Sequence, residues 1–235
     1  LLFGMTANAQ DKPAEVYVYS TYHSCDFSKQ DRADALFEQT QKPGYEAAVK
    51  AGTISSYGWL AHQTGGKWRR ADYFTAGSVQ ALLDAQKTMT DQEDAKAKKA
   101  FEEFGAICSS HDDYIWRRVA GNIGTVTRGG AAFSTYYVCD QTRESEADAL
   151  VTQVFGPVYD KMVADGKIKS WGWNEHIVGG SYRRLATMSA TDMKSLMEAR
   201  ADLVQALEDN VLGDTFTAIC GDHADYMWEI TSQNP

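Results

Sequence analysis

The clearest hint of a ligand in this sequence is an aromatic residue followed by two arginines, a run that occurs twice. The runs are Trp68-Arg69-Arg70 and Tyr182-Arg183-Arg184, and both lie in stretches typical of β-strands. Side chains alternate along a strand, so one arginine of each run points into semi-buried surface. A buried guanidinium needs an acceptor, either an internal carboxylate such as Asp72 or the carboxylate of a bound molecule. Ala186 stands at the place that matches Asp72, so Arg184 lacks that internal partner.

In each copy, one tryptophan on the preceding predicted strand completes this candidate site. Alternation puts each of them on the same face as the second arginine of its run. Aromatic rings at such positions are usually core residues, but they also contact flat ligands. The predicted ligand-binding residues are Trp59, Trp68, Arg70, Trp173, Tyr182 and Arg184.

Four histidines at matched positions are candidate bases. His62 and His176 end a predicted strand, whereas His111 and His223 each precede an aspartate by two positions. A histidine oriented by a carboxylate can act as a general base or as half of a metal site. A histidine that ends a helix is also favoured by the helix dipole alone. The predicted acid/base set at the rim of the sheets is His62, His111, Asp113, His176, His223 and Asp225; no metal site or cofactor is predicted, and His23 is set aside because Tyr137 replaces it.

The four cysteines form two matched pairs, and an even number in an oxidising compartment indicates disulfides. Four cysteines allow three pairings. In the element order given below, the end of the first strand and the end of the last helix meet at one edge of the sheet. This favours Cys25 with Cys108 and Cys139 with Cys220, each worth at most about 4–5 kcal/mol. Free buried thiols and a thiolate metal site are the alternatives.

The matched positions belong to a tandem repeat. When residues 57–70 are placed over residues 171–184, seven of fourteen positions are identical, where ordinary composition gives about one. The offset is 114 residues along most of the chain and 112 near the end of each copy. The chain is therefore interpreted as one unit of about 110 residues written twice.

Each copy predicts the element order β-α-β-β-α-β, the split arrangement of a ferredoxin-like sheet. In the first copy the expected elements are a strand over 16–22, helical residues 30–50 interrupted at Pro43, hairpin strands over 54–62 and 67–75, a helical region ending at Cys108, and a strand over 115–120. The second copy repeats this order. The predicted organisation is a signal-peptide remnant over 1–9, repeat 1 over 15–120, a linker over 121–130 and repeat 2 over 131–232.

Charge and the first residues limit location and partners. The formal net charge is −9, which disfavours nucleic acid and anionic membranes. No apolar run approaches the ~18–20 residues of a membrane span. An apolar start followed by Ala7-Asn8-Ala9 fits a signal-peptidase site, so we expect a periplasmic or secreted protein that begins at Gln10. A chance pair of alanines in a disordered N-terminus is the alternative.

Both faces of the hairpin strands carry large side chains, which indicates that both are at least partly buried. We therefore expect an α+β fold in which two tandem ferredoxin-like βαββαβ units pack sheet to sheet as a pseudo-two-fold α/β barrel. Such an arrangement resembles the dimeric α/β-barrel superfamily, which includes antibiotic-biosynthesis monooxygenases, NIPSNAP-like proteins and the haem-binding chlorite-dismutase group. The resemblance rests on element order and the hairpin, and no catalytic motif of these families is matched.

Three functions fit these observations. The first is an exported, non-catalytic protein that binds a small anionic or aromatic molecule between or at the rim of the two sheets. The second is a cofactor-independent oxygenase or isomerase of the barrel type, in which His and Tyr polarise the substrate. The third is a structural or partner-binding module. The sequence favours the first, names no catalytic residue, and leaves the oligomeric state open.

Overall fold

A computed structural model describes residues 15–91, 97–122, 124, 128–208 and 210–234. The predicted signal-peptide remnant and four residues of the predicted linker, 123 and 125–127, lie outside these residues. Within them, no helix is both long and apolar enough to cross a membrane.

The first half has the predicted element order. Its helical segment is divided at Pro43, which lies in the first turn of the second helix, where a missing N–H costs nothing. The elements are β1 (Tyr17–Ser24), a short 3-10 turn (Phe27–Lys29), α1 (Gln30–Thr40), α2 (Lys42–Lys50), β2 (Ser56–Gly65), β3 (Arg70–Ala76), α3 (Val79–Asp91), α4 (Lys98–Ile107) and β4 (Ser110–Gly121).

The second half follows the same order. A π-helical turn (Val151–Phe155) joins its first two helices, and Pro157 lies in the first turn of the second. The elements are β5 (Ala131–Val138), α5 (Glu144–Leu150), α6 (Gly156–Ala164), β6 (Ser170–Val178), β7 (Arg184–Ala190), α7 (Met193–Glu208), α8 (Val211–Ile219) and β8 (Asp222–Asn234).

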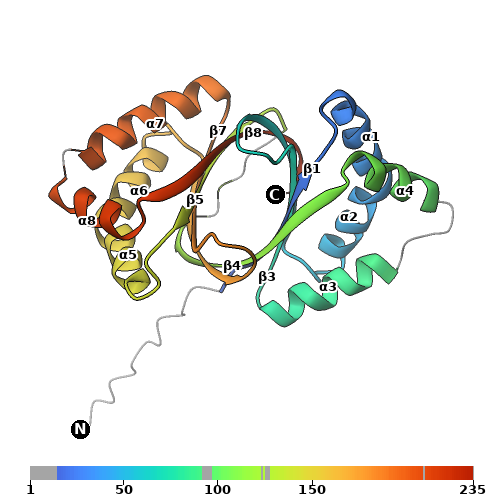
Figure 1. The fold of residues 1–235 in the computed structure, drawn as a ribbon, viewed down its shortest axis with the longest axis horizontal. Coiled ribbons are helices and arrows are strands. Elements are labelled where there is room, and N and C mark those ends of the chain that lie inside the picture. Colours follow the sequence, from blue (N-terminus) through green and yellow to red (C-terminus); the bar gives the residue numbers. More distant parts are fainter. Residues whose placement is uncertain (1–14, 92–96, 123, 125–127, 209, 235) are drawn as a thin grey trace, which may run out of the picture.

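The eight strands close into one antiparallel barrel in the order β1-β3-β2-β8-β5-β7-β6-β4. Figure 1 shows this barrel between two helical layers, α1–α4 on one side and α5–α8 on the other. The predicted α/β barrel is therefore confirmed. Its two sheets also join edge to edge, at a β2·β8 seam and a β4·β6 seam. Closure pairs backbone groups that open edge strands would leave bare.

The inner face of the barrel is filled by aromatic side chains. Tyr114 stacks on Trp116 with ring centroids 4.9 Å apart, and Tyr226 stacks on Trp228 at 5.2 Å. The interior cluster also holds Tyr22, Trp68, Tyr136 and Leu185. The second buried face inferred from the sequence is thus the lumen of the barrel, and large rings pack it.

The final strands are longer than their sequence predicts. β4 begins at Ser110 rather than near Ile115, and β8 at Asp222 rather than near Met227. Polar residues such as His111 and Asp113 resemble a loop, but each pairs with a residue of β1. Tertiary pairing therefore overrides the local pattern.

Two disulfides tie the last helix of each half to the end of its first strand, as predicted. Cys25 bonds Cys108, and Cys139 bonds Cys220. Beside each bond a backbone N–H donates across the same edge, Asp26 to Ile107 and Asp140 to Ile219. The two bonds indicate an oxidising, extracellular environment.

Candidate functional site

The arginines singled out by the sequence are held by acids on the helices. Arg184 donates from Nε and Nη2 to the two carboxylate oxygens of Asp148, at 2.7 and 2.8 Å, and its Nη1 lies 3.1 Å from Glu144. Arg70 makes the equivalent fork to Asp34. The internal acceptor that the sequence allowed for Arg70 is present, but it is Asp34 of α1, more than 30 residues earlier in the chain, rather than Asp72.

The six predicted ligand residues do not form one pocket. The indole N–H of Trp59 donates to Asp34, and that of Trp173 donates to Asp148, so these tryptophans lie with the arginines under the helices. Trp68 and Tyr182 instead lie in the lumen. Each precedes the first residue of its strand, so the two-residue alternation does not extend to it.

The predicted acid/base residues are also separated. His62 packs against Tyr226 and Trp228 of β8, with centroids 6.3 and 6.1 Å away, and Arg69 approaches its Nδ1 at 2.9 Å. Burial, followed by the charge of nearby arginines, lowers the pKa of His62. His176 is placed alike against Tyr114 and Trp116, with its pKa lowered by burial and Arg183.

The His-x-Asp pairs lie on the outer face of the barrel wall. His111 is 3.2 Å from Asp113, and His223 is 3.7 Å from Asp225, all about half exposed. The ring of His111 lies 6.0 Å from His23 on β1. Among the residues that the structure describes, no group of three His, Cys, Asp or Glu gathers as metal ligands do.

A buried hydrogen-bonded chain in the first half was missed by the sequence analysis. His23 Nε2 lies 2.6 Å from Asp72 Oδ1, and the Tyr45 hydroxyl donates to Asp72 Oδ2 at 2.7 Å. The histidine and aspartate side chains are 8% and 6% exposed. The matching positions are Tyr137 and Ala186, so the two halves differ at both partners together. This joint difference between the two halves is visible in the sequence and could have identified the hydrogen-bonded chain.

Arg118 defines the strongest candidate ligand site, at the β4·β6 seam. Trp116 of β4 lies in the lumen, and Arg118, two residues further on, continues the same face. Asn174 of β6 pairs with Arg118 across this seam. Gly172 lies two residues before Asn174, on the same face of β6. A methyl group added to Gly172 would lie 2.9 Å from Thr187 Oγ1, 3.4 Å from Asn174 Nδ2 and 3.7 Å from Arg118 Nε. Hydroxyl, amide and guanidinium thus surround one small niche.

The polar groups of this niche are incompletely paired. Arg118 Nε and Asn174 Oδ1 are buried without a hydrogen-bond partner in the described structure. Burial lowers the pKa of Arg118, and the group that opposes this effect is the Tyr73 phenol rather than a carboxylate. Burial also raises the pKa of Tyr73 to about 12, which keeps it a neutral donor. The neighbouring Arg117, by contrast, is paired with Glu175.

The other seam shows that this polarity is not required for closure of the barrel. At the β2·β8 seam, Leu60 pairs with Ile230 at the places that match Asn174 and Arg118. Ile230 is 3% exposed. At this pair of positions one seam is therefore apolar, whereas the other carries a guanidinium without an acid partner among the described residues. The exchange of Leu60 for Asn174 was visible in the sequence, but its meaning required the pairing with Arg118.

Comparison with known proteins gives the fold. No protein-family model and no curated protein matches the sequence. Among solved structures, a proposed monooxygenase from Lactobacillus acidophilus NCFM has a TM-score of 0.63 at 6% identity and covers 94% of this chain and 95% of its own. An anthrone oxidase-like protein has a TM-score of 0.54 at 12% identity, covering 94% and 93%. A mutant chlorite dismutase from Candidatus Nitrospira defluvii has 0.57 at 9%, covering 92% of each chain. At such identities the likeness concerns architecture: this chain has the fold of the dimeric, ferredoxin-like α/β barrels.

Proposed function

We propose that this protein is a non-catalytic binding protein for a small anionic molecule, which it holds inside the barrel at the β4·β6 seam. The observation that carries the proposal is Arg118, whose Nε is buried with no hydrogen-bond partner among the described residues. The site lies between the two four-stranded halves of the barrel, where the sequence placed a ligand, but it uses other residues.

The energetics favour an anion at this place. A guanidinium whose Nε is buried without a partner is costly, so a chain that only needed a closed barrel would do better with the Leu60–Ile230 pair of the other seam. An anionic group in the niche would receive charge-assisted hydrogen bonds from Arg118, which are about twice as strong as neutral ones. A molecule that binds only the folded state also stabilises the fold by mass action.

The surrounding groups suggest the ligand's chemistry. A carboxylate accepts from Arg118 and from the Thr187 hydroxyl, whereas the unpartnered Asn174 Oδ1 requires a donor such as a hydroxyl or amine. The ring of Tyr73, which lies against Gly58, offers a flat wall. A small hydroxy or amino carboxylate satisfies these groups.

We further infer that the two halves are tandem copies of one ferredoxin-like unit and that a signal peptide directs the chain to the periplasm or outside the cell. The support is the 114-residue repeat and the Ala7-Asn8-Ala9 motif. A ligand that binds at one seam requires polar residues at that seam alone. The apolar Leu60–Ile230 pair at one seam and the polar Asn174–Arg118 pair at the other agree with a ligand acquired after duplication.

The test is calorimetry with a panel of hydroxy and amino carboxylates of four or five carbons. Arg118→Ile combined with Asn174→Leu copies the other seam, and we expect it to abolish binding while raising thermal stability. Arg117→Met is the matched control, because this outward-facing neighbour is partly exposed in its ion pair with Glu175, and it should leave binding unchanged. Loss of stability in the double variant, or unchanged binding, would overturn the proposal and favour a structural or partner-binding module.

The His23–Asp72–Tyr45 chain keeps an oxygenase or isomerase as a second candidate. A histidine held by a buried carboxylate has the geometry of a general base. Turnover of an enolisable or phenolic substrate, lost in His23→Gln and retained in Arg118→Ile, would favour this enzyme over the binding protein.

A further inference from the structure

One pair of equivalent positions carries an aspartate in the first half and an alanine in the second. In the first half, Asp72 stands opposite Thr21 of β1, and its carboxylate bridges Tyr45 and His23. In the second half, Ala186 stands opposite Thr135 of β5 in the same register. The first half therefore has a hydrogen-bonded carboxylate at this position, and the second half has none there.

The groups that would hold such a carboxylate remain in the second half. Tyr159 matches Tyr45 and Tyr137 matches His23 at the same 114-residue offset. No described residue hydrogen-bonds the Tyr159 hydroxyl, and its electrostatic partners are Tyr137 and Arg200. The Tyr137 phenol is likewise influenced by Arg200, and it hydrogen-bonds the Thr135 side chain. Two phenol donors and a guanidinium therefore surround the position that Ala186 leaves free.

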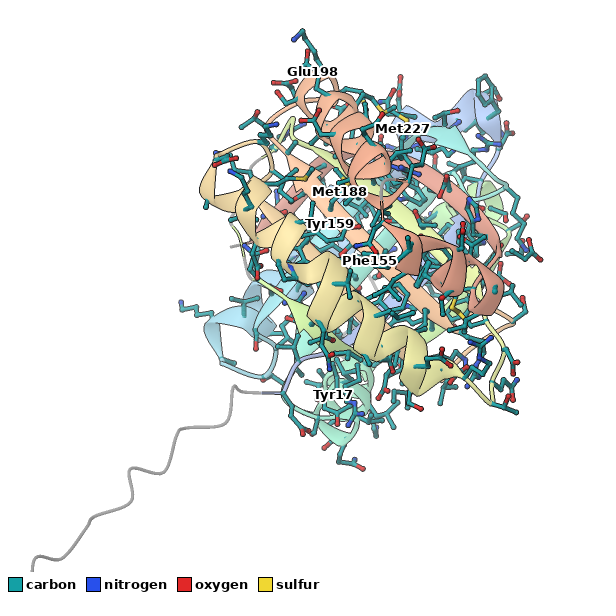
Figure 2. All side chains as sticks on the ribbon, turned by 90° about the vertical axis from the view of Figure 1, so that its left-hand side faces the viewer. Tyr17, Phe155, Tyr159, Met188, Glu198 and Met227 are labelled. Atoms are coloured by element: carbon teal, nitrogen blue, oxygen red, sulfur yellow. A yellow bond between two sulfur atoms is a disulfide. The ribbon has the colours of Figure 1, made fainter. Side chains whose placement is uncertain are left out.

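Space is present at the same place. Two adjoining cavities of about 30 and 50 Å³ are both lined by Tyr137, Tyr159, Ala186 and Leu207. A water molecule needs roughly 10–15 Å³ of such space, so a molecule of a few heavy atoms fits. Neither cavity has room for a haem, and no histidine lines either of them. In Figure 2, Phe155 and Tyr159 of the helical layer lie near Met188 of β7, in this region between helices and strands.

Arg200 supplies charge that the first half does not have. It lines the larger cavity, and its guanidinium carbon lies 5.1 Å from the ring centre of Phe133. The matching Gln86 instead donates to the Tyr19 hydroxyl at 2.9 Å. The negative charge of Asp225 also acts on the Tyr137 phenol and disfavours the binding of an anion beside it. Its counterpart Asp113 acts on Tyr45 beside Asp72, so the fold already accommodates two neighbouring carboxylates.

We infer that the second half binds a free carboxylate of two or three carbons, whose carboxylate group takes the place that Asp72 fills in the first half. It accepts hydrogen bonds from Tyr137 and Tyr159, and Arg200 balances its charge. The short carbon chain extends into the apolar part of the cavities beside Leu207. Arg118 and Asn174 line neither cavity, so this site under the helices is distinct from theirs, although Gly172 and Thr187 of the barrel wall border both places.

Acetate is the probe, with acetamide as the neutral control of equal size, and binding is followed by calorimetry and thermal melting. Ala186→Asp supplies the carboxylate covalently. We expect it to raise the melting temperature and abolish acetate binding, while Arg200→Gln, the residue of the first half, weakens binding about ten-fold or more. Arg118→Ile should leave acetate binding at this site unchanged, which separates the two proposals.

A reciprocal variant tests the same idea without relying on the second half. Asp72→Ala should destabilise the first half, and acetate should restore part of the lost melting temperature because Tyr45 and His23 remain in place. Acetamide binding equal to acetate, or acetate binding unaffected by Ala186→Asp, would overturn the inference. So would a wild-type protein whose melting temperature does not respond to acetate.

Discussion

Asp148 of α5 receives a two-pronged hydrogen bond from Arg184, the first residue of β7, through atoms 2.7 and 2.8 Å apart. The arginine side chain is 4% exposed and the carboxylate 19%. This pair joins the helical layer to the barrel wall, and the Trp173 indole donates to the same carboxylate. It therefore marks a structural junction, repeated by Asp34 and Arg70 in the first half.

Removing this arginine should weaken the fold. Arg184→Met keeps the apolar stem but leaves the partly buried Asp148 without its cation, and we expect a loss of about 3 kcal/mol in the free energy of unfolding. Urea denaturation measures the change. Arg143→Met is the control, since Arg143 and Glu146 form an exposed pair that adds little to stability. Equal effects of both variants would contradict the structural role.

Two glycines at matching positions should respond differently to alanine. In Gly58→Ala the new methyl group would lie 2.4 Å from the Tyr73 ring, so we expect a loss of about 1–3 kcal/mol from overpacking. In Gly172→Ala the nearest atom is the rotatable Thr187 hydroxyl, so the fold should tolerate the change. The methyl group nevertheless fills the niche beside Arg118, and calorimetry should show loss of binding of the four- and five-carbon hydroxy and amino carboxylates. Retained binding would place the ligand elsewhere.

Acidification should destabilise the barrel rim through His62 and His176. Burial and nearby arginines lower the pKa of both histidines below the ordinary 6.5. The folded state therefore favours the neutral form, and this contribution is present above pH 6.5 and is lost as pH falls through the lower folded pKa. NMR titration of the imidazole protons checks the direction. In His62→Asn, the difference in urea midpoint between pH 7.5 and 5.5 should shrink.

Reduction of the disulfides should cost several kcal/mol of stability. Each bond closes a loop of more than 80 residues, for which chain entropy gives about 4–5 kcal/mol. Thiol titration of the denatured, unreduced protein should find no free cysteine. A reducing agent should lower the melting temperature markedly, and Cys25→Ser with Cys108→Ser should reproduce part of that loss.

Export should produce a mature chain that starts at Gln10. N-terminal sequencing of protein secreted from its native host checks this directly. A chain that retains residues 1–9 inside the cytoplasm would contradict the export proposal, and the disulfides would then require another source of oxidation.

The sequence by itself determined the local elements and the disulfide pairing of this protein. Strand composition, the break at Pro43 and the repeat predict structure from neighbouring residues, and Cys25 and Cys108 could be paired because one sheet edge follows from element order. Only the tertiary structure decided how the two sheets join, that Asp34 rather than Asp72 holds Arg70, and that Trp68 turns into the lumen. It also brought Arg118 to face Asn174, and Tyr159 to face Ala186. These relationships depend on which distant segments of the chain pack together. Side-chain packing and backbone pairing across the barrel determine those contacts, and the periodicity of residues along the chain carries no information about them.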